Sequence, residues 1–458
     1  MSFIDKVISI LPEVSRPEQK KLAFSTKFKW TIVVLVFFFL LGKIQLFGVA
    51  SSSLDRYANL ALLLGAKFGS LISLGIGPIV TASIILQLLN GAGILSIDTS
   101  TPQGKKKYQG IQQLTSFFFI IFESIVYVML GGLSPDPMYL GSSTYSILQF
   151  LIIFQLFLGG FMIMLMDEIV QKWGFGSGIS LFIAAGVSET IFVRMFSWVK
   201  PVGSDYSVGA VWSFFQGLSN GALSYSFLML SGILVTLLVF GIAIYFQSMK
   251  VEIPLSFGRI RGHGIRWPLN FLYTSNIPVI LIAALLANLQ IAAQLLSKVF
   301  PAINPQAIQG WVTGPRLLPL IIQNHTLAIG WLPYAQALVY LLIFLGGSIL
   351  FSWFWVQASG LDAKSQAKNI LKSGLQVPGF RKDPRVIERL LDRYIKPLTV
   401  MGAIAVALIA TFADMTGAFG TGTGILLTVM IIYKLYEDIA KEHLGDMNPA
   451  MRRFMGNR

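Results

Sequence analysis

The chain has 458 residues, of which 54% are hydrophobic and only 12% are charged, and its mean hydropathy is +0.70. Soluble proteins carry about 25% charged residues, so this composition excludes an ordinary soluble globular protein. The chain has no cysteine, which excludes disulfides, and its three scattered histidines indicate that there is no metal site. The net charge of +14 fits two interpretations, the positive-inside rule of membrane proteins or binding to anionic lipid or RNA.

The first 24 residues are predicted to form a cytoplasmic amphipathic segment. Apolar side chains recur at helical spacing over residues 2–11, and Pro12 ends the pattern. The first long apolar run begins only near Phe28 and is too long for the core of a cleavable signal peptide.

Ten spanning helices are predicted along the chain. A helix needs about 20 apolar residues to cross a bilayer, and runs of about this length recur throughout. They are 28–48, 76–90, 111–132, 146–166, 178–195, 226–247, 271–296, 334–357, 395–413 and 421–440.

A shorter apolar piece at 57–68 precedes the second span. Its 12 residues are too few to cross, and Gly75-Ile-Gly-Pro78 separates it from residues 79–90. We expect a re-entrant half-helix followed by a spanning helix. Broken backbone at membrane depth is tolerated only inside protein or beside a water-filled cavity, so this element is expected inside the bundle.

The positive charges give the orientation. If the N-terminus is cytoplasmic, 28 of the 35 Lys and Arg residues fall in cytoplasmic segments. This bias places both termini in the cytoplasm, and because an odd number of spans would break the alternation, it also supports ten.

Two halves of five helices show matching interruptions. Spans 2 and 5 begin at Gly75–Pro78 and Gly174–Gly178, and spans 7 and 10 begin at Asn276–Pro278 and Gly420–Gly424. Interrupted helices at corresponding positions indicate an inverted repeat and mark its pathway, so helices 2, 5, 7 and 10 are expected to line it.

The chain is predicted to divide into five regions. They are an N-terminal segment 1–24, an N-terminal half 25–195, an external hinge loop 196–225, a C-terminal half 226–445 with cytoplasmic loops 250–266 and 358–394, and a tail 446–458.

Ionisable residues are rare within the spans, where Glu123 and Lys43 are the clearest. Ion and proton transporters usually place such groups in the membrane, whereas here aliphatic residues follow each break. These residues have two interpretations, ordinary helix packing or a hydrophobic constriction that blocks ions by dewetting. A secondary transporter remains the alternative, and it would need a compact polar site at the midplane.

Several segments together are similar to the archaeal type of the SecY family. They follow in family order and spacing: Gly75–Leu89, Asp167–Val170, Gly176–Ser188, Val251–Leu255, Gly258–Gly262, Ser275–Ile280, Gly379–Lys382, Pro397–Val400 and Gly422–Leu427. The resemblance implies an all-α membrane protein that forms the channel of a protein-conducting translocon. No catalytic motif of the HExxH or P-loop type is present in the sequence, so we expect no enzyme activity, no cofactor and no catalytic or metal-binding residue.

The resemblance also implies a pore. A ring of six aliphatic side chains would form its constriction: Ile76, Val80, Ile179, Ile183, Ile280 and Leu427. The neighbouring Leu426 is an alternative to Leu427 for the last position. A plug at about 58–68 would close the external funnel and would include Ala58, Leu60, Leu62, Leu63, Leu64 and Lys67.

A lateral gate is implied between helices 2 and 3 on one side and 7 and 8 on the other, with a polar cluster of Thr81, Glu123 and Asn288. Thr81 and Asn288 could equally make interhelical hydrogen bonds that only hold the bundle together. Through this gate, transmembrane segments of the translocated polypeptide would pass sideways from the channel into the lipid.

The basic cytoplasmic loops resemble the family's ribosome-docking surface, with positive-inside charge as the alternative interpretation. The candidate residues are Arg259, Arg261, Arg266, Arg381 and Lys382. The implied partners are a one-helix SecE/gamma-type subunit, a small Sec-beta-type subunit, the ribosome, signal-bearing polypeptides, membrane lipids and a second copy of the channel. The implied location is the cell membrane.

Overall fold

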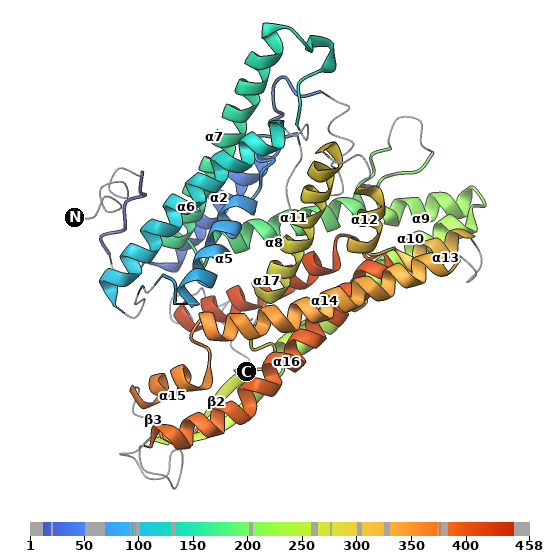
Figure 1. The fold of residues 1–458 in the computed structure, drawn as a ribbon. Coiled ribbons are helices and arrows are strands. Elements are labelled where there is room, and N and C mark those ends of the chain that lie inside the picture. Colours follow the sequence, from blue (N-terminus) through green and yellow to red (C-terminus); the bar gives the residue numbers. More distant parts are fainter. Residues whose placement is uncertain are drawn as a thin grey trace. The chain divides into compact units, whose positions relative to one another are not determined.

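The structure is a computed structural model of residues 1–458 (Figure 1). It describes residues 12–19, 22–50, 69–91, 93–95, 97, 101–129, 133–200, 205–257, 264–274, 277–299, 305–324, 330–372, 375–376 and 383–443. The chain forms two compact units. Unit 1 comprises residues 1–86, 96–189 and 431–458, and unit 2 comprises 87–95 and 190–430.

Unit 1 is built around one long helix. This helix, α7 (Ser143–Trp173), packs against α2 (Phe24–Leu41) and α6 (Pro102–Met129). Two consecutive glycines on α7 let neighbours approach closely, because a Cβ on Gly159 would lie 1.8 Å from the backbone oxygen of Leu71, and one on Gly160 would lie 2.7 Å from Ile120. A 3-10 turn, η1 (Pro137–Tyr139), precedes α7, and α5 (Gly77–Gly91) and α8 (Gly178–Phe196) begin in this unit.

Unit 2 is a second bundle, centred on α14 (Trp331–Ala358) and α16 (Pro384–Thr416). α14 packs against α16 and against α11 (Ile277–Val299), and α10 (Leu223–Ser248) packs against α16. Short helices complete the unit: α9 (Ala210–Ser219), α12 (Pro305–Val312) and α13 (Leu317–Asn324). The last helix, α17 (Gly422–His443), starts in unit 2 and ends in unit 1.

A small sheet lies at one end of unit 2. Strands β1 (Lys250–Phe257), β2 (Gly264–Asn270) and β3 (Leu375–Gln376) pair antiparallel in the order β2-β1-β3. The sheet shares a core with α15 (Ala363–Lys372) and the first turns of α16, which includes Ile253, Leu269, Ile370 and Leu391. Neither this sheet nor α15 was predicted from the sequence, because both lie in segments interpreted only as basic loops.

The predicted all-α membrane fold is confirmed, since each of the ten predicted spans overlaps a helix. In the described part of the chain, seven helices are long and apolar enough to cross a membrane: α2, α6, α7, α8, α10, α14 and α16. The other three are α5, α11 and α17. α5 and the part of α11 at 277–286 are shorter apolar helices, and α17 ends in a polar stretch containing Lys434, Glu437 and Asp438.

The interruptions also have a structural counterpart. Gly75, Gly176 and Gly420 have φ values of 58°, 69° and 103° and stand just before α5, α8 and α17. L-residues with a side chain rarely adopt such values, so glycine is needed where the chain turns into each helix. The remaining predicted interruption, Asn276–Pro278, includes residue 276, which lies outside the described residues.

Candidate functional site

The entry to α5 carries the first two residues of the predicted ring, Ile76 and Val80. The N–H of Val80 donates to the carbonyl of Ile76 at 3.0 Å, so Ile76 directly precedes α5 and Val80 lies in its first turn. The segment before them is hydrogen-bonded to the residues that follow α2, because Leu46 N–H donates to Gly69 O and Leu71 N–H donates to Ile44 O, both at 2.8 Å. Ile76 and Val80 keep partly exposed side chains.

The entry to α8 carries Ile179 and Ile183, which are also partly exposed. The buried carboxylate of Asp167 on α7 accepts hydrogen bonds from Ile179 N–H at 2.9 Å and from Gln171 Nε2 at 2.8 Å. On the other side of the interruption, Phe175 N–H donates to Thr31 Oγ1 of α2 at 3.1 Å. Two neighbouring helices therefore fix the turn from α7 into α8.

The two ring candidates of unit 2 differ in exposure. Ile280, in the first turn of α11, is partly exposed, whereas Leu427 on α17 is 7% exposed and its neighbour Leu426 is 1% exposed. The start of α17 is fixed by Asp414 of α16, whose carboxylate accepts a hydrogen bond from Gly422 N–H at 2.6 Å.

The predicted gate cluster is described in part. Glu123 lies on α6, and its Oε2 is 3.6 Å from the position that a Cβ on Gly77 would occupy. The carboxyl of Glu123 therefore lies beside the first residue of α5, at ordinary contact distance. Thr81 lies one turn further along α5 and is partly exposed. Asn288 lies on α11, and its side chain is outside the described residues.

The predicted plug lies outside the described residues, as do four of the five predicted docking residues, Arg259, Arg261, Arg381 and Lys382. The fifth, Arg266 on β2, is exposed and pairs with Glu252 on β1 at 2.9 Å. The structure also places three further basic residues of the predicted loop 358–394 on a helix. Arg385, Arg389 and Arg393 recur every four residues on α16, and all three are exposed.

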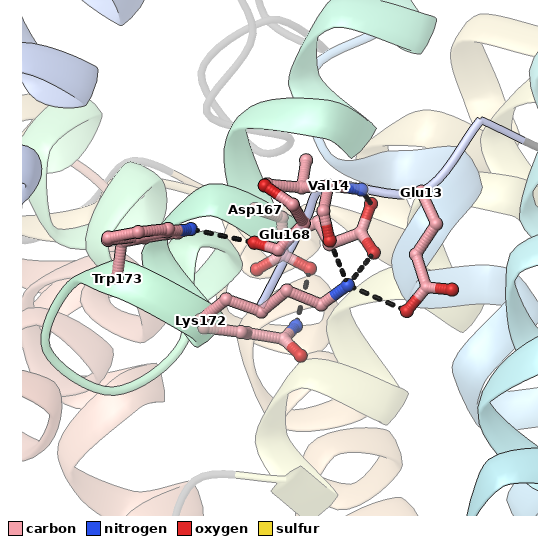
Figure 2. Close-up of polar contacts among 8 residues, drawn as sticks. Glu13, Val14, Asp167, Glu168, Lys172 and Trp173 are labelled. Carbon is pink, nitrogen blue, oxygen red and sulfur yellow. Dashed lines mark hydrogen bonds and ion pairs between the residues drawn. The ribbon is translucent and has the colours of Figure 1, made fainter. Parts of the chain in front are cut away.

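A polar cluster joins the N-terminal segment to the end of α7 (Figure 2). Lys172 Nζ donates to Glu13 Oε1 and Glu168 Oε1, each at 2.7 Å, and to the carbonyl of Val14 at 2.5 Å. Trp173 Nε1 donates to the carbonyl of Ser15 at 2.9 Å, and Val14 N–H donates to Glu168 at 3.2 Å. The Lys172 hydrogen bond holds the pKa of Glu13 below its usual value, because the ammonium stabilises the ionised carboxylate.

The SecY family model matches residues 70–436. The chain belongs to the SecY family. Curated members named protein translocase subunit SecY are similar over nearly the whole chain. The protein from Methanothermobacter thermautotrophicus is 39% identical, over 99% of this chain and 98% of its own. The protein from Pyrococcus furiosus is 41% identical, over 97% of both chains. These archaeal relatives confirm the archaeal type.

Solved structures agree with this assignment. A protein-conducting channel is 37% identical, with a TM-score of 0.78 over 97% of this chain and 98% of its own. Sec61 in a canine ribosome-channel complex from the endoplasmic reticulum is also 37% identical, with a TM-score of 0.75 over 97% and 98% of the two chains. The chain is therefore an integral membrane protein with the SecY fold.

Proposed function

We propose that this chain is the central, channel-forming subunit of a Sec protein-conducting translocon. The observation that carries the proposal is the full-length likeness to archaeal SecY proteins and to a protein-conducting channel. The alternative function, a secondary transporter of a small solute, finds no support among these relatives. A channel subunit performs no covalent chemistry, which is in keeping with a chain whose sequence shows no catalytic motif.

The proposed constriction is the aliphatic ring of Ile76, Val80, Ile179, Ile183, Ile280 and Leu427. Dispersion contacts need no specific partner, so branched side chains can pack around an extended polypeptide of any sequence. The same side chains offer ions no ligands in place of water, and an empty ring therefore stays dry. Three findings support this assignment. Four of the six residues lie within the first two turns of α5 and α8 or directly before them, the segments at both helix starts are held by hydrogen bonds, and five of the six side chains are partly exposed.

A plug at 58–68 would back up the ring, and a lateral gate would release apolar segments into lipid. A signal sequence that enters the gate gains roughly 25 cal/mol for each Å² of apolar surface that it buries. Thr81, Glu123 and Asn288 would hold the gate closed by polar contacts. The position of the Glu123 carboxyl beside Gly77, the first residue of α5, supports a role for this carboxyl in the gate.

The proposed partners follow from the charged cytoplasmic loops and from the relatives. Sec61 of similar sequence occurs in a ribosome-channel complex, and phosphate-rich RNA favours clusters of Lys and Arg. We propose ribosome docking on the loops that carry Arg259, Arg261, Arg266, Arg381 and Lys382. SecE-type and Sec-beta-type subunits are proposed as further partners, and the location as the cell membrane with both termini in the cytoplasm.

A complementation experiment tests the function. Cells depleted of this chain should stop exporting a reporter that carries a signal sequence, and re-expression of the parent chain should restore export. The Ile179→Asp variant would place a charge in the ring and should fail to restore export despite normal membrane insertion. Continued export of the reporter in depleted cells that lack this chain would contradict the proposal.

A further inference from the structure

A buried carboxylate joins α7 to α8 in unit 1. Asp167 is 6% exposed, and its Oδ1 accepts a hydrogen bond from the backbone N–H of Ile179 at 2.9 Å. Gln171 Nε2 donates to the other carboxylate oxygen at 2.8 Å, one turn later on the same helix. Gly178, the first residue of α8, lies so close that a Cβ there would be 2.6 Å from Asp167 Cα.

The same arrangement recurs in unit 2, between α16 and α17. Asp414 stands in the last turn of α16 and accepts a hydrogen bond from the backbone N–H of Gly422 at 2.6 Å. Its other oxygen accepts from the hydroxyl of Tyr340 on α14 at 2.8 Å. Gly422 is the first residue of α17, and a Cβ there would be 2.0 Å from the backbone oxygen of Ala410 on α16.

The two sites share four features. Each has a long helix, a short linker with a glycine at positive φ, a second helix that starts at a closely packed glycine, and an Asp on the first helix that binds an N–H in the first turn of the second. The first N–H groups of a helix have no partner within the helix, and a carboxylate is favoured at this positive end of the dipole. A charged acceptor also makes a stronger and more directional hydrogen bond than a neutral one.

We propose that Asp167 and Asp414 are paired positioning residues, which fix the first turns of α8 and α17 and thereby the ring side chains that follow them. The inference rests on the proposed function of Ile179, Ile183 and Leu427 in the constriction. Ile179 supplies the hydrogen-bonded N–H itself, and Ile183 lies one turn further on α8. Leu427 lies five residues after Gly422. The polypeptide must push these side chains apart and the ring must close again, so each of the two helices needs a fixed starting point.

Each Asp has a neighbour that orients its second oxygen. Gln171 does so for Asp167 and Tyr340 for Asp414. These neighbours allow a milder perturbation than removal of the carboxylate, because Gln171→Met and Tyr340→Phe leave the acceptor in place and remove only the group that orients it. Gln171 is exposed, so the first of these variants should fold without difficulty.

The test uses the complete translocon in lipid nanodiscs and measures hydrogen exchange of the segments 176–184 and 420–428. Asp167→Leu and Asp414→Leu should each accelerate exchange at their own segment by about tenfold or more, since the N–H loses a charged acceptor. Asp167→Asn and Asp414→Asn keep an oxygen acceptor but lose its charge, so exchange should rise less than in the Leu variants. Gln171→Met and Tyr340→Phe keep the charged acceptor, and exchange in these variants should also lie between the parent and the Leu variants. Ser116→Ala and Thr411→Val are matched controls, because each removes a buried hydroxyl that donates to a carbonyl of its own helix.

Resting ion conductance in planar bilayers then tests the consequence for the ring. Both Leu variants should leak more than the parent, the Asn variants should leak less than the Leu variants, and both controls should match the parent. Unchanged exchange in the Leu, Gln171→Met and Tyr340→Phe variants would overturn the positioning role. Replacement of Ile76, Ile179 and Ile280 together by Ser separates this inference from the proposed function. If this triple variant leaks and the Leu variants do not, the carboxylates do not position the ring, whereas a tight triple Ser channel would contradict the constriction itself.

Discussion

Lys172 and Glu13 lie 159 residues apart in the sequence, and their side chains form an ion pair with a distance of 2.7 Å between Nζ and Oε1. Lys172 is the more buried partner, with 13% of its side chain exposed against 52% for Glu13. Lys172 also bonds Glu168 and the carbonyl of Val14, so the N-terminal segment is attached to the same end of α7 from which the chain turns into α8.

Lys172→Met should release this attachment, because it removes the donor to three oxygens at once. We expect faster hydrogen exchange and faster proteolysis at residues 12–17 in the membrane-embedded protein. Glu13→Gln is the milder control, since it removes one charge and leaves the Glu168 and Val14 contacts in place. Equal protection of residues 12–17 in the parent and in Lys172→Met would contradict the attachment.

The attachment should also weaken in acid. The folded-state pKa of Glu13 is lowered by Lys172, so its contribution to stability is present above the unfolded pKa, near 4.3, and is lost as pH falls through the lower folded value. Glu13 is half exposed, and the contribution is therefore small. Protection of residues 12–17 should fall in this acidic range in the parent, and Glu13→Gln should lose that component of the pH dependence.

Tyr273 gives a prediction at the opposite end of the pH scale. It lies between β2 and α11, before the spanning helix begins. Its hydroxyl donates to the carbonyl of Leu361 at 2.7 Å, and burial together with the charge of Asp362 raises its pKa to about 12. A raised folded-state pKa contributes stability that is present below the unfolded value near 10 and is lost as pH rises through the folded value. Tyr273→Phe should cost about 1 kcal/mol at neutral pH, measured by thermal unfolding in detergent. It should also remove one tyrosinate component near pH 12 from the ultraviolet titration.

Two glycine substitutions should have opposite effects. A Cβ on Gly159 would lie 1.8 Å from the backbone oxygen of Leu71, whereas a Cβ on Gly241 of α10 meets nothing within 4 Å. Gly159→Ala must push the segment before α5 away from α7 and should destabilise the protein by about 1–3 kcal/mol. Gly241→Ala removes only the flexibility of the unfolded chain and should be neutral or stabilising by up to about 1 kcal/mol. Equal thermal stabilities of the two variants would contradict the close packing.

The sequence predicted the helices well because the signal for a spanning helix is strong and local. A run of about 20 apolar residues and a glycine-rich interruption are visible without knowing any neighbour. Asp167, Asp414 and Lys172 were not given roles from the sequence. Their importance depends on contacts with Ile179, Gly422 and Glu13, and nothing in local composition shows these contacts. The β1–β2 hairpin was missed for a different reason. Polar and apolar residues alternate along β1, but the segment was interpreted as a cytoplasmic loop because of its positive charge.

Ribosome docking should depend on the basic loops. Reversal of Arg259, Arg261 and Arg381 to Glu should weaken binding and flatten its dependence on salt, because the counterions released from RNA phosphates set that slope. Reversal of Arg385, Arg389 and Arg393 on α16 is a matched change of equal charge on an exposed helical surface. A larger loss from the α16 variant in co-sedimentation would move the docking surface to that helix. Unchanged binding in both variants would leave positive-inside topology as the explanation of the charge.

The ring and the plug should differ in how they seal the resting channel. Replacement of Ile76, Ile179 and Ile280 together by Ser places hydroxyls at the constriction, which should wet it and raise resting conductance in planar bilayers. Replacement of the same three residues by Val keeps branched aliphatic side chains and is the matched control, which should remain tight. Deletion of residues 58–68 should give only a flickering, partial leak, because the dry ring remains as the main barrier. If the triple Ser channel is as tight as the parent while the deletion leaks fully, the plug is the seal and the assignment of the ring is wrong.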